Sequence, residues 1–147
     1  MDITNTLNYN DLSIPILDIS SNSSISGWST FKKKYTTEKI ISSNLIKVDT
    51  YYIVNGIKFH ASSEVLIKVD GEIKSVVVKD LYDEFMNKKI VSVLNYQLED
   101  VLITDFKFEE RTSVRNRCAF LNVIVNGNAI YLPYSEYSIL IRGALFV

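Results

Sequence analysis

Two-residue turn signals between β-rich runs constrain this sequence more than any other feature. An asparagine or aspartate followed by glycine occurs at Asn55-Gly56, Asp70-Gly71 and Asn126-Gly127. Both residues of such a pair tolerate positive φ, which the tight turn of a β-hairpin requires. Each pair lies between runs that are rich in isoleucine, valine or tyrosine, and these residues favour strands. We therefore expect a hairpin turn at each of the three pairs.

The rest of the chain has the same strand-like character. The run Lys39–Val48 is rich in isoleucine, but Ser42–Asn44 within it is typical of a turn, so we expect a break there. One short helix is expected at Lys79–Lys89, where apolar side chains recur on one face. Further strands are expected at residues 89–96, 99–110, 118–125 and 137–147. The pattern predicts an all-β domain of short strands and hairpins with at most one short helix.

Composition limits the classes of protein to consider. A length of 147 residues suits one domain, and a hydrophobic content of 47% can supply a core without metal or disulfide support. The net charge of -1 argues against a dedicated nucleic-acid binder. The single cysteine, Cys118, lies in an apolar run, and we interpret it as a buried hydrophobe in a reducing compartment. We expect no secretory signal, no membrane span, no metal site and no cofactor.

The first 27 residues differ from the remainder, because they are rich in asparagine, serine and aspartate and show no sustained period. We expect an extended amino-terminal arm at 1–27 and a β domain at 28–147. Ordering the backbone costs about 1–2 kcal/mol per residue, which a free arm with few apolar residues does not recover. The arm is therefore expected to be disordered alone and ordered against a neighbouring subunit, with a frayed tail as the alternative. The expected partner contacts are Leu12, Ile14, Ile16, Leu17 and Trp28.

The only histidine, His60, precedes two serines, Ser62 and Ser63. A histidine beside a hydroxyl could act as a general base for a nucleophile. Sequence neighbours rarely form such a device, because its members are normally assembled in space from distant segments. We interpret His60 as structural and expect no catalytic residue in this chain.

Two basic clusters are candidates for an anionic partner. Lys32–Lys34 lie among the aromatic residues Trp28, Phe31 and Tyr35, an arrangement that can bind single-stranded nucleic acid. The second cluster contains Arg111, Arg115 and Arg117, preceded by two glutamates. We interpret both clusters as solvated loops between strands, with nucleic-acid binding through Lys32–Lys34 as the alternative.

The order of these elements resembles the Hint (hedgehog/intein) self-processing family. The resemblance rests on a tyrosine-rich strand and turn, a short block that normally reads Thr-x-x-His, an Asp-Gly hairpin and a late Asn-Gly block ending in tyrosine. The corresponding runs here are TYYIVNGIKF, HASSEVLI, KVDGEIKSVVVKDL, KKIVSVL and FLNVIVNGNAIYLPYSEYSILI. The resemblance extends over about Thr37–Arg142 and implies a Hint-like β fold.

The departures from the family pattern bear on activity. The resemblance implies an activating histidine where this chain has Ser63, and a threonine where it has His60. The family's terminal His-Asn pair, whose asparagine cyclises to cut the chain, falls at about Arg142-Gly143. We identify no reactive cysteine or serine that opens the domain. The acyl shift needs an activated nucleophile and a proton donor for the leaving amine, so the resemblance implies a catalytically degenerate domain.

Inactive Hint-like modules are similar to domains of tailed-phage structural proteins. We therefore expect a non-enzymatic virion protein of the tail, baseplate or a connector, assembled in the host cytoplasm and packed against other virion proteins. The first alternative is a self-processing or hydrolytic Hint-type enzyme that uses His60 with Ser62 or Ser63. The second alternative is the nucleic-acid-binding module described above.

Overall fold

Antiparallel strand pairing dominates the architecture. The computed structural model describes residues 6–9, 12–87, 91–111, 117–127, 129–135 and 137–147. The strands are β1 (Thr6–Tyr9), β2 (Leu12–Pro15), β3 (Ser24–Ser29), β4 (Lys34–Val48), β5 (Thr50–Val54), β6 (Ile57–Phe59), β7 (Glu64–Val69), β8 (Glu72–Val77), β9 (Ser92–Leu94), β10 (Asp100–Leu102), β11 (Phe106–Glu110), β12 (Cys118–Val125), β13 (Ile130–Tyr134) and β14 (Ile139–Phe146). One α-helix, α1 (Val78–Asn87), and one short 3₁₀ helix, Ile16–Asp18, complete the described chain. The expected all-β fold with a single short α-helix is confirmed.

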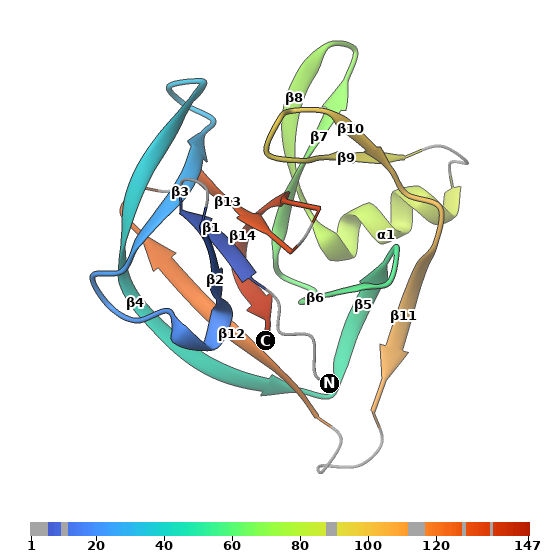
Figure 1. Cartoon of the computed structure of the whole chain (residues 1–147). Helices are drawn as coiled ribbons and strands as arrows, with labels where there is room; N and C mark the ends of the chain where they lie inside the picture. The colour runs from blue at the N-terminus through green and yellow to red at the C-terminus, as the bar shows by residue number, and fades with distance from the viewer. Residues whose placement is uncertain (1–5, 10–11, 88–90, 112–116, 128, 136) are drawn as a thin grey trace.

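Most strands belong to one strongly bent sheet. Its pairing order is β11-β5-β6-β14-β12-β4-β3-β13-β1-β2, and β7 joins it through β14 and carries β8 on its other side. A separate two-stranded sheet is formed by β9 and β10. In Figure 1 the long β4 curves along the left of the view, while α1 and the pairs β7–β8 and β9–β10 gather on the right. Strand β14 connects these parts, because it pairs with β6, β7, β12 and β13.

Two of the three expected hairpins are confirmed. Asn55-Gly56 joins β5 to β6, and Asp70-Gly71 joins β7 to β8. All four turn residues have positive φ, between 49° and 82°. This backbone matches the right-handed twist of the flanking strands, which is why these dipeptides favour two-residue turns.

The expected hairpin at Asn126-Gly127 is wrong. Strand β12 pairs with β4 and β14, whereas β13 pairs with β1, β3 and β14. Gly127 has a φ of 98°, but Asn126 is absent from the positive-φ residues, so the pair does not form a turn with two left-handed residues. The chain passes here from one part of the sheet to another, and a dipeptide signal does not determine which strands pair.

The break expected at Ser42–Asn44 does not occur. Strand β4 runs without interruption from Lys34 to Val48, and these three residues pair with Asn122–Ile124 of β12. The sheet neighbour satisfies backbone groups that a turn would otherwise satisfy. Long-range pairing thus overrides the local turn preference of serine and asparagine.

Helix α1 packs some of its side chains against the sheet and leaves others exposed. Val78 and Leu81 are buried, and the ring centroid of Phe85 lies 5.6 Å from that of Phe106 on β11. The helix begins one residue before the expected start, and the last two expected residues, Lys88 and Lys89, lie outside the described residues. Within the described chain, no helix has the length and apolarity needed to cross a membrane.

The amino-terminal segment belongs to the domain, which corrects the expected boundary after Gly27. That boundary falls inside β3, and β1 pairs with β13 near the other end of the sequence. Leu7 and Ile16 have no exposed surface and belong to the main core, which also takes in Ile19 and Ile25. Much of the apolar surface of the expected arm therefore packs against this chain. Residues 1–5, 10 and 11 of the expected arm lie outside the described residues.

A matched pair of neighbours tests this placement. Ile16→Ala should lower the free energy of unfolding by about 2–5 kcal/mol, because it leaves a cavity in the core. Leu17→Ala is the control: its side chain is 63% exposed, and we expect a change below about 0.5 kcal/mol. Urea denaturation followed by circular dichroism measures both. Equally small losses for the two variants would contradict a core role for Ile16.

Candidate functional site

The turn from His60 to Ser63 connects β6 to β7 and is fixed to the start of α1. The Ser63 N–H donates to the His60 carbonyl at 3.1 Å, which closes the turn. The N–H groups of Val78 and Lys79 donate to the carbonyls of Ser63 and Ala61, at 2.8 and 3.2 Å. These backbone bonds hold the turn, so its side chains are presented on a rigid support.

His60 and Ser62 are in direct contact at this turn. The Ser62 Oγ lies 2.7 Å from His60 Nδ1, and the Ser62 N–H donates to the same nitrogen at 3.1 Å. The imidazole is half-buried and stands edge-to-face against Phe120, with 5.5 Å between ring centroids. Burial lowers the pKa of His60 below its usual value, because the charged imidazolium loses hydration.

Ser63 has a different environment from Ser62. Its side chain has no exposed surface, and its Oγ donates a hydrogen bond of 2.7 Å to the Ala144 carbonyl of β14. Opposite it, Gly143 has a φ of 112°, and a Cβ at Gly143 would lie 3.6 Å from the Ser63 Cα. The position where the family pattern has a histidine is thus a closed contact between the turn and β14.

A polar pocket adjoins this contact. It has a volume of about 290 Å³ and is lined in part by Ser62, Glu64, Asn122, Arg142 and Gly143. Arg142 donates to the Glu64 carboxylate at 2.6 Å, and both side chains are about one-third exposed. The pocket therefore combines an exposed hydroxyl with a partly sheltered ion pair.

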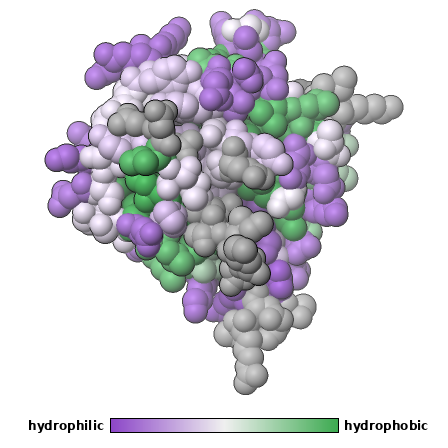
Figure 2. Space-filling model, in the orientation of Figure 1, coloured by the Kyte–Doolittle hydropathy of each residue, from purple (hydrophilic) through white to green (hydrophobic). Residues whose placement is uncertain are grey.

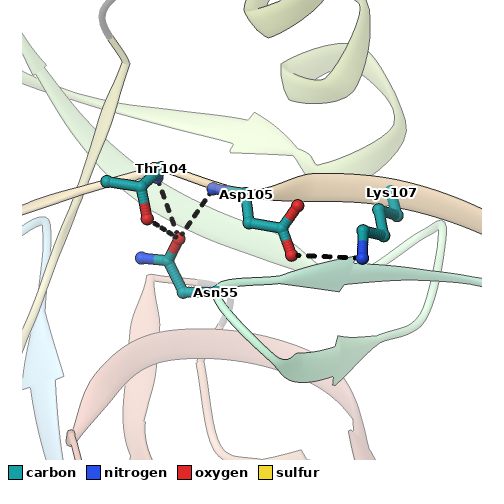
Figure 3. Close-up of polar contacts among 4 residues, drawn as sticks. All are labelled: Asn55, Thr104, Asp105 and Lys107. Atoms are coloured by element: carbon teal, nitrogen blue, oxygen red, sulfur yellow. Dashed lines mark hydrogen bonds and ion pairs between the residues drawn. The ribbon is translucent and has the colours of Figure 1, made fainter.

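Asn55 has a second role beyond its hairpin turn. Figure 3 shows its Oδ1 accepting from the Thr104 N–H and Oγ1–H and from the Asp105 N–H, at 2.9, 3.2 and 3.2 Å. Its Nδ2 donates to the Leu102 carbonyl at 2.9 Å. These bonds draw backbone groups of Thr104 and Asp105 away from strand pairing. The single strand expected at 99–110 is for this reason divided into β10 and β11. Asn55 and Thr104 also border an apolar pocket of about 260 Å³.

The two described members of the second basic cluster, Arg111 and Arg117, have different environments. Arg111 Nε donates to the Tyr51 hydroxyl at 2.8 Å, and that hydroxyl donates to Glu109 at 2.7 Å. Burial, followed by the Glu109 contact, raises the pKa of Tyr51 to about 12. Arg117 is exposed, and Arg115 lies outside the described residues. Cys118 is buried beside Tyr51, as expected for a small hydrophobe.

The first basic cluster forms an exposed turn between β3 and β4. Phe31 is 85% exposed, and Lys32–Lys34 are exposed beside it. Tyr35 is half exposed, and its ring centroid lies 4.6 Å from that of Tyr96. Trp28, by contrast, is buried in a second core cluster with Leu66, Leu94, Tyr131 and Leu140.

The predicted partner residues also separate into two groups. Leu12 and Leu17 are 65% and 63% exposed, and Ile14 is half-buried. Ile16 and Trp28 are buried within this chain, so their assignment as partner contacts is wrong. Among the described residues, no group of three or more histidine, cysteine, aspartate or glutamate side chains is arranged to hold a metal ion.

Two inteins and an intein-like domain are among the solved structures to which this chain is similar. A bacterial intein-like domain from Clostridium thermocellum superimposes with a TM-score of 0.73 at 9% identity, over 94% of both chains. A splice-inactive variant of the AceL NrdHF class 3 split intein gives 0.66 at 13% identity, over 97% of this chain and 95% of that one. The TvoVMA intein gives 0.63 at 9% identity, over 94% of both chains. No protein-family profile and no curated protein matches the sequence.

These comparisons establish an intein-like fold, as the resemblance implied. At such low identities they concern the fold alone. The superpositions cover 94% and 97% of this chain, so the part left unmatched is smaller than a 27-residue arm. Most of the amino-terminal segment therefore lies within the common fold. The sequence carried no signal for the Glu64–Arg142 pair, the polar pocket or the bonds of Asn55 to Thr104 and Asp105, because all of them join segments far apart in the chain.

The depressed pKa of His60 predicts a pH dependence of stability. The unfolded chain binds a proton at a pH near 6.5, while the native chain does so only at lower pH. The contribution of His60 to stability is therefore present above about pH 6.5 and is lost as the pH falls toward the native pKa. Because the chain has one histidine, a single imidazole resonance reports this titration by NMR. A native pKa above 6.5, or an identical pH profile of unfolding in His60→Asn, would contradict the assignment.

The closed contact at Ser63 predicts that the family's histidine no longer fits. Ser63→His should lower the free energy of unfolding by about 1–3 kcal/mol, because the larger ring overpacks the space against β14. Ser62→His, at the exposed neighbour, is the control, with an expected change within about 0.5 kcal/mol. Thermal and urea unfolding compare the two variants. A Ser63→His protein as stable as the parent chain would show that the site is open rather than closed.

Proposed function

We propose that this chain is a non-enzymatic structural protein of a tailed-phage particle, in the tail, baseplate or connector. It would act by packing against neighbouring virion proteins. The observation that carries the non-enzymatic part is the contact between Ser63 and β14. The virion part is supported by the likeness of degenerate Hint-like modules to structural domains of phages.

The contact bears on self-processing through simple chemistry. Cleavage of the chain needs a group that protonates or polarises the scissile amide, and a serine hydroxyl near its ordinary pKa is a poor proton donor. The Ser63 hydroxyl already donates to the Ala144 carbonyl. Arg142 and Gly143, at the positions of the family's terminal His-Asn pair, lie inside β14 and are followed by further paired residues. A guanidinium and a glycine have no side-chain amide that could cyclise.

The packing surface is proposed at the edge strand β2 and the 3₁₀ helix that follows it. Strand β2 ends the pairing order of the sheet and pairs with β1 alone in the described chain. Such an edge has backbone groups available to a partner strand. Leu12 and Leu17 are exposed and Ile14 is half-buried, so the revised contact set omits Ile16 and Trp28.

The surface pattern is compatible with small anchors rather than one broad apolar interface. Figure 2 shows hydrophobic residues in separate patches among hydrophilic ones on the face of the molecule that it presents. Full burial of one leucine contributes about 1.5–3 kcal/mol. Two leucines and a partly buried isoleucine, together with strand-pairing hydrogen bonds, would suit a subunit that is held by repeated contacts in a particle.

Incorporation into virions tests this proposal. Leu12→Asp with Leu17→Asp should leave the fold intact, because both side chains are exposed, but should reduce the amount of chain in purified virions. Met86→Asp is the matched control, since Met86 is 64% exposed and lies on α1. Quantitative peptide mass spectrometry of the particles gives the readout. Absence of the parent chain from virions would refute the virion assignment, and full incorporation of the double variant would refute the β2 surface.

A further inference from the structure

We propose that Ser62 is an acyl-accepting nucleophile that His60 activates, and that it takes a short acyl group from an activated ester. This site goes beyond the proposed function and does not depend on it. A single acylation of a side chain modifies the protein and requires no turnover. The nucleophile lies in the turn between β6 and β7, so it is distinct from a residue that opens the domain.

The direction of the hydrogen bond follows from the two contacts of His60. The backbone N–H of Ser62 can only donate, and it points at Nδ1 from 3.1 Å. Nδ1 must therefore be the unprotonated nitrogen, with the proton on Nε2. The Ser62 hydroxyl, at 2.7 Å from Nδ1, must then donate its proton to that nitrogen. This is the polarity that a general base requires toward its nucleophile.

The surroundings keep the base available and the nucleophile accessible. Burial lowers the pKa of His60, so the imidazole remains neutral near pH 7. The edge-to-face contact with Phe120 restricts rotation of the ring. Ser62 is exposed, whereas Ser63 beside it is buried and bonded to Ala144. The two adjacent serines thus differ in two properties that decide reactivity: access to solvent and contact with a base.

The adjoining pocket provides a place for the acyl group. Ser62 lies in its wall together with the Glu64–Arg142 pair, and its volume is about 290 Å³. This size suits a short acyl chain. The lining combines the Glu64–Arg142 ion pair with apolar side chains such as Val123 and Leu132, so it can contact both the carbonyl and the alkyl part of an acyl group.

The reaction step balances without a cofactor. The Ser62 Oγ attacks the carbonyl carbon of the ester, and its proton passes to His60 Nδ1. The bond from the carbonyl carbon to the leaving oxygen breaks, and the proton on Nδ1 passes to that oxygen. The products are an acyl-Ser62 ester, a free alcohol or phenol, and neutral His60.

Two features restrict the donor to an activated ester. Nδ1 already accepts the Ser62 N–H, which lowers its basicity and opposes its protonation. Within the described chain, no recorded hydrogen bond orients Nε2 in the way that a carboxylate does in a catalytic triad. A donor with a good leaving group needs less assistance from the base, so p-nitrophenyl acetate is the appropriate probe.

The test is acetylation of the full chain by p-nitrophenyl acetate, followed by intact mass and peptide mapping. We expect one acetyl group to map to Ser62 before any other hydroxyl. Ser62→Ala should lose this adduct. His60→Asn should slow it on the order of a hundredfold, the lower end of general-base contributions, because no group orients the imidazole.

Two controls make each outcome decisive. Ser20→Ala removes an exposed serine whose hydroxyl lies 3.3 Å from that of Ser23 rather than beside a base, and it should leave the rate unchanged. Mapping on the parent chain gives the site even where Ser62→Ala fails to fold. Acetylation at lysines alone, an equal rate at Ser20 and Ser62, or an unchanged rate in His60→Asn would each overturn the proposal.

Discussion

Strand β14 is the constraint on which the rest of the structure depends. It pairs with β6, β7, β12 and β13, so elements from the middle and the end of the chain meet on it. The buried Ser63 hydroxyl is bonded to the Ala144 carbonyl of this strand. Gly143 lies where β14 contacts the turn at Ser63, and its φ of 112° is unfavourable for residues other than glycine. This strand therefore holds the turn at Ser63 and the two parts of the sheet together.

Strand pairing next to β14 also explains why the amino-terminal segment folds with the domain. Strand β13 pairs with β14 and also with β1 and β3. These pairings bring Leu7 of β1 and Ile25 of β3 into the main core. The sequence did not predict this, because these residues are spread among serines and asparagines without a period. Only their position opposite distant strands makes them core residues. Leu12 and Leu17 come from the same segment but remain on its surface.

The features that could be predicted from the sequence are those that depend on residues close together in the chain. The turns at Asn55-Gly56 and Asp70-Gly71 follow from positive φ within the dipeptides, and α1 follows from its apolar spacing. The partners of β12 and the continuity of β4 depend on pairing between segments far apart, so the dipeptide at Asn126-Gly127 and the polar run Ser42–Asn44 were misleading. At the site, the resemblance implies that Ser63 stands where the family has a histidine, and this correspondence stays a prediction. The sequence offered Ser62 and Ser63 equally as partners of His60, because the choice between them depends on the conformation of a turn that backbone bonds hold against α1.

We propose that this chain keeps the intein-like fold without self-processing activity. The most direct measurement is the intact mass of the chain expressed with a different tag at each end, before and after treatment with hydroxylamine. The account predicts one species of full mass that carries both tags under both conditions. Loss of either tag, or a hydroxylamine-sensitive break in the chain, would contradict it.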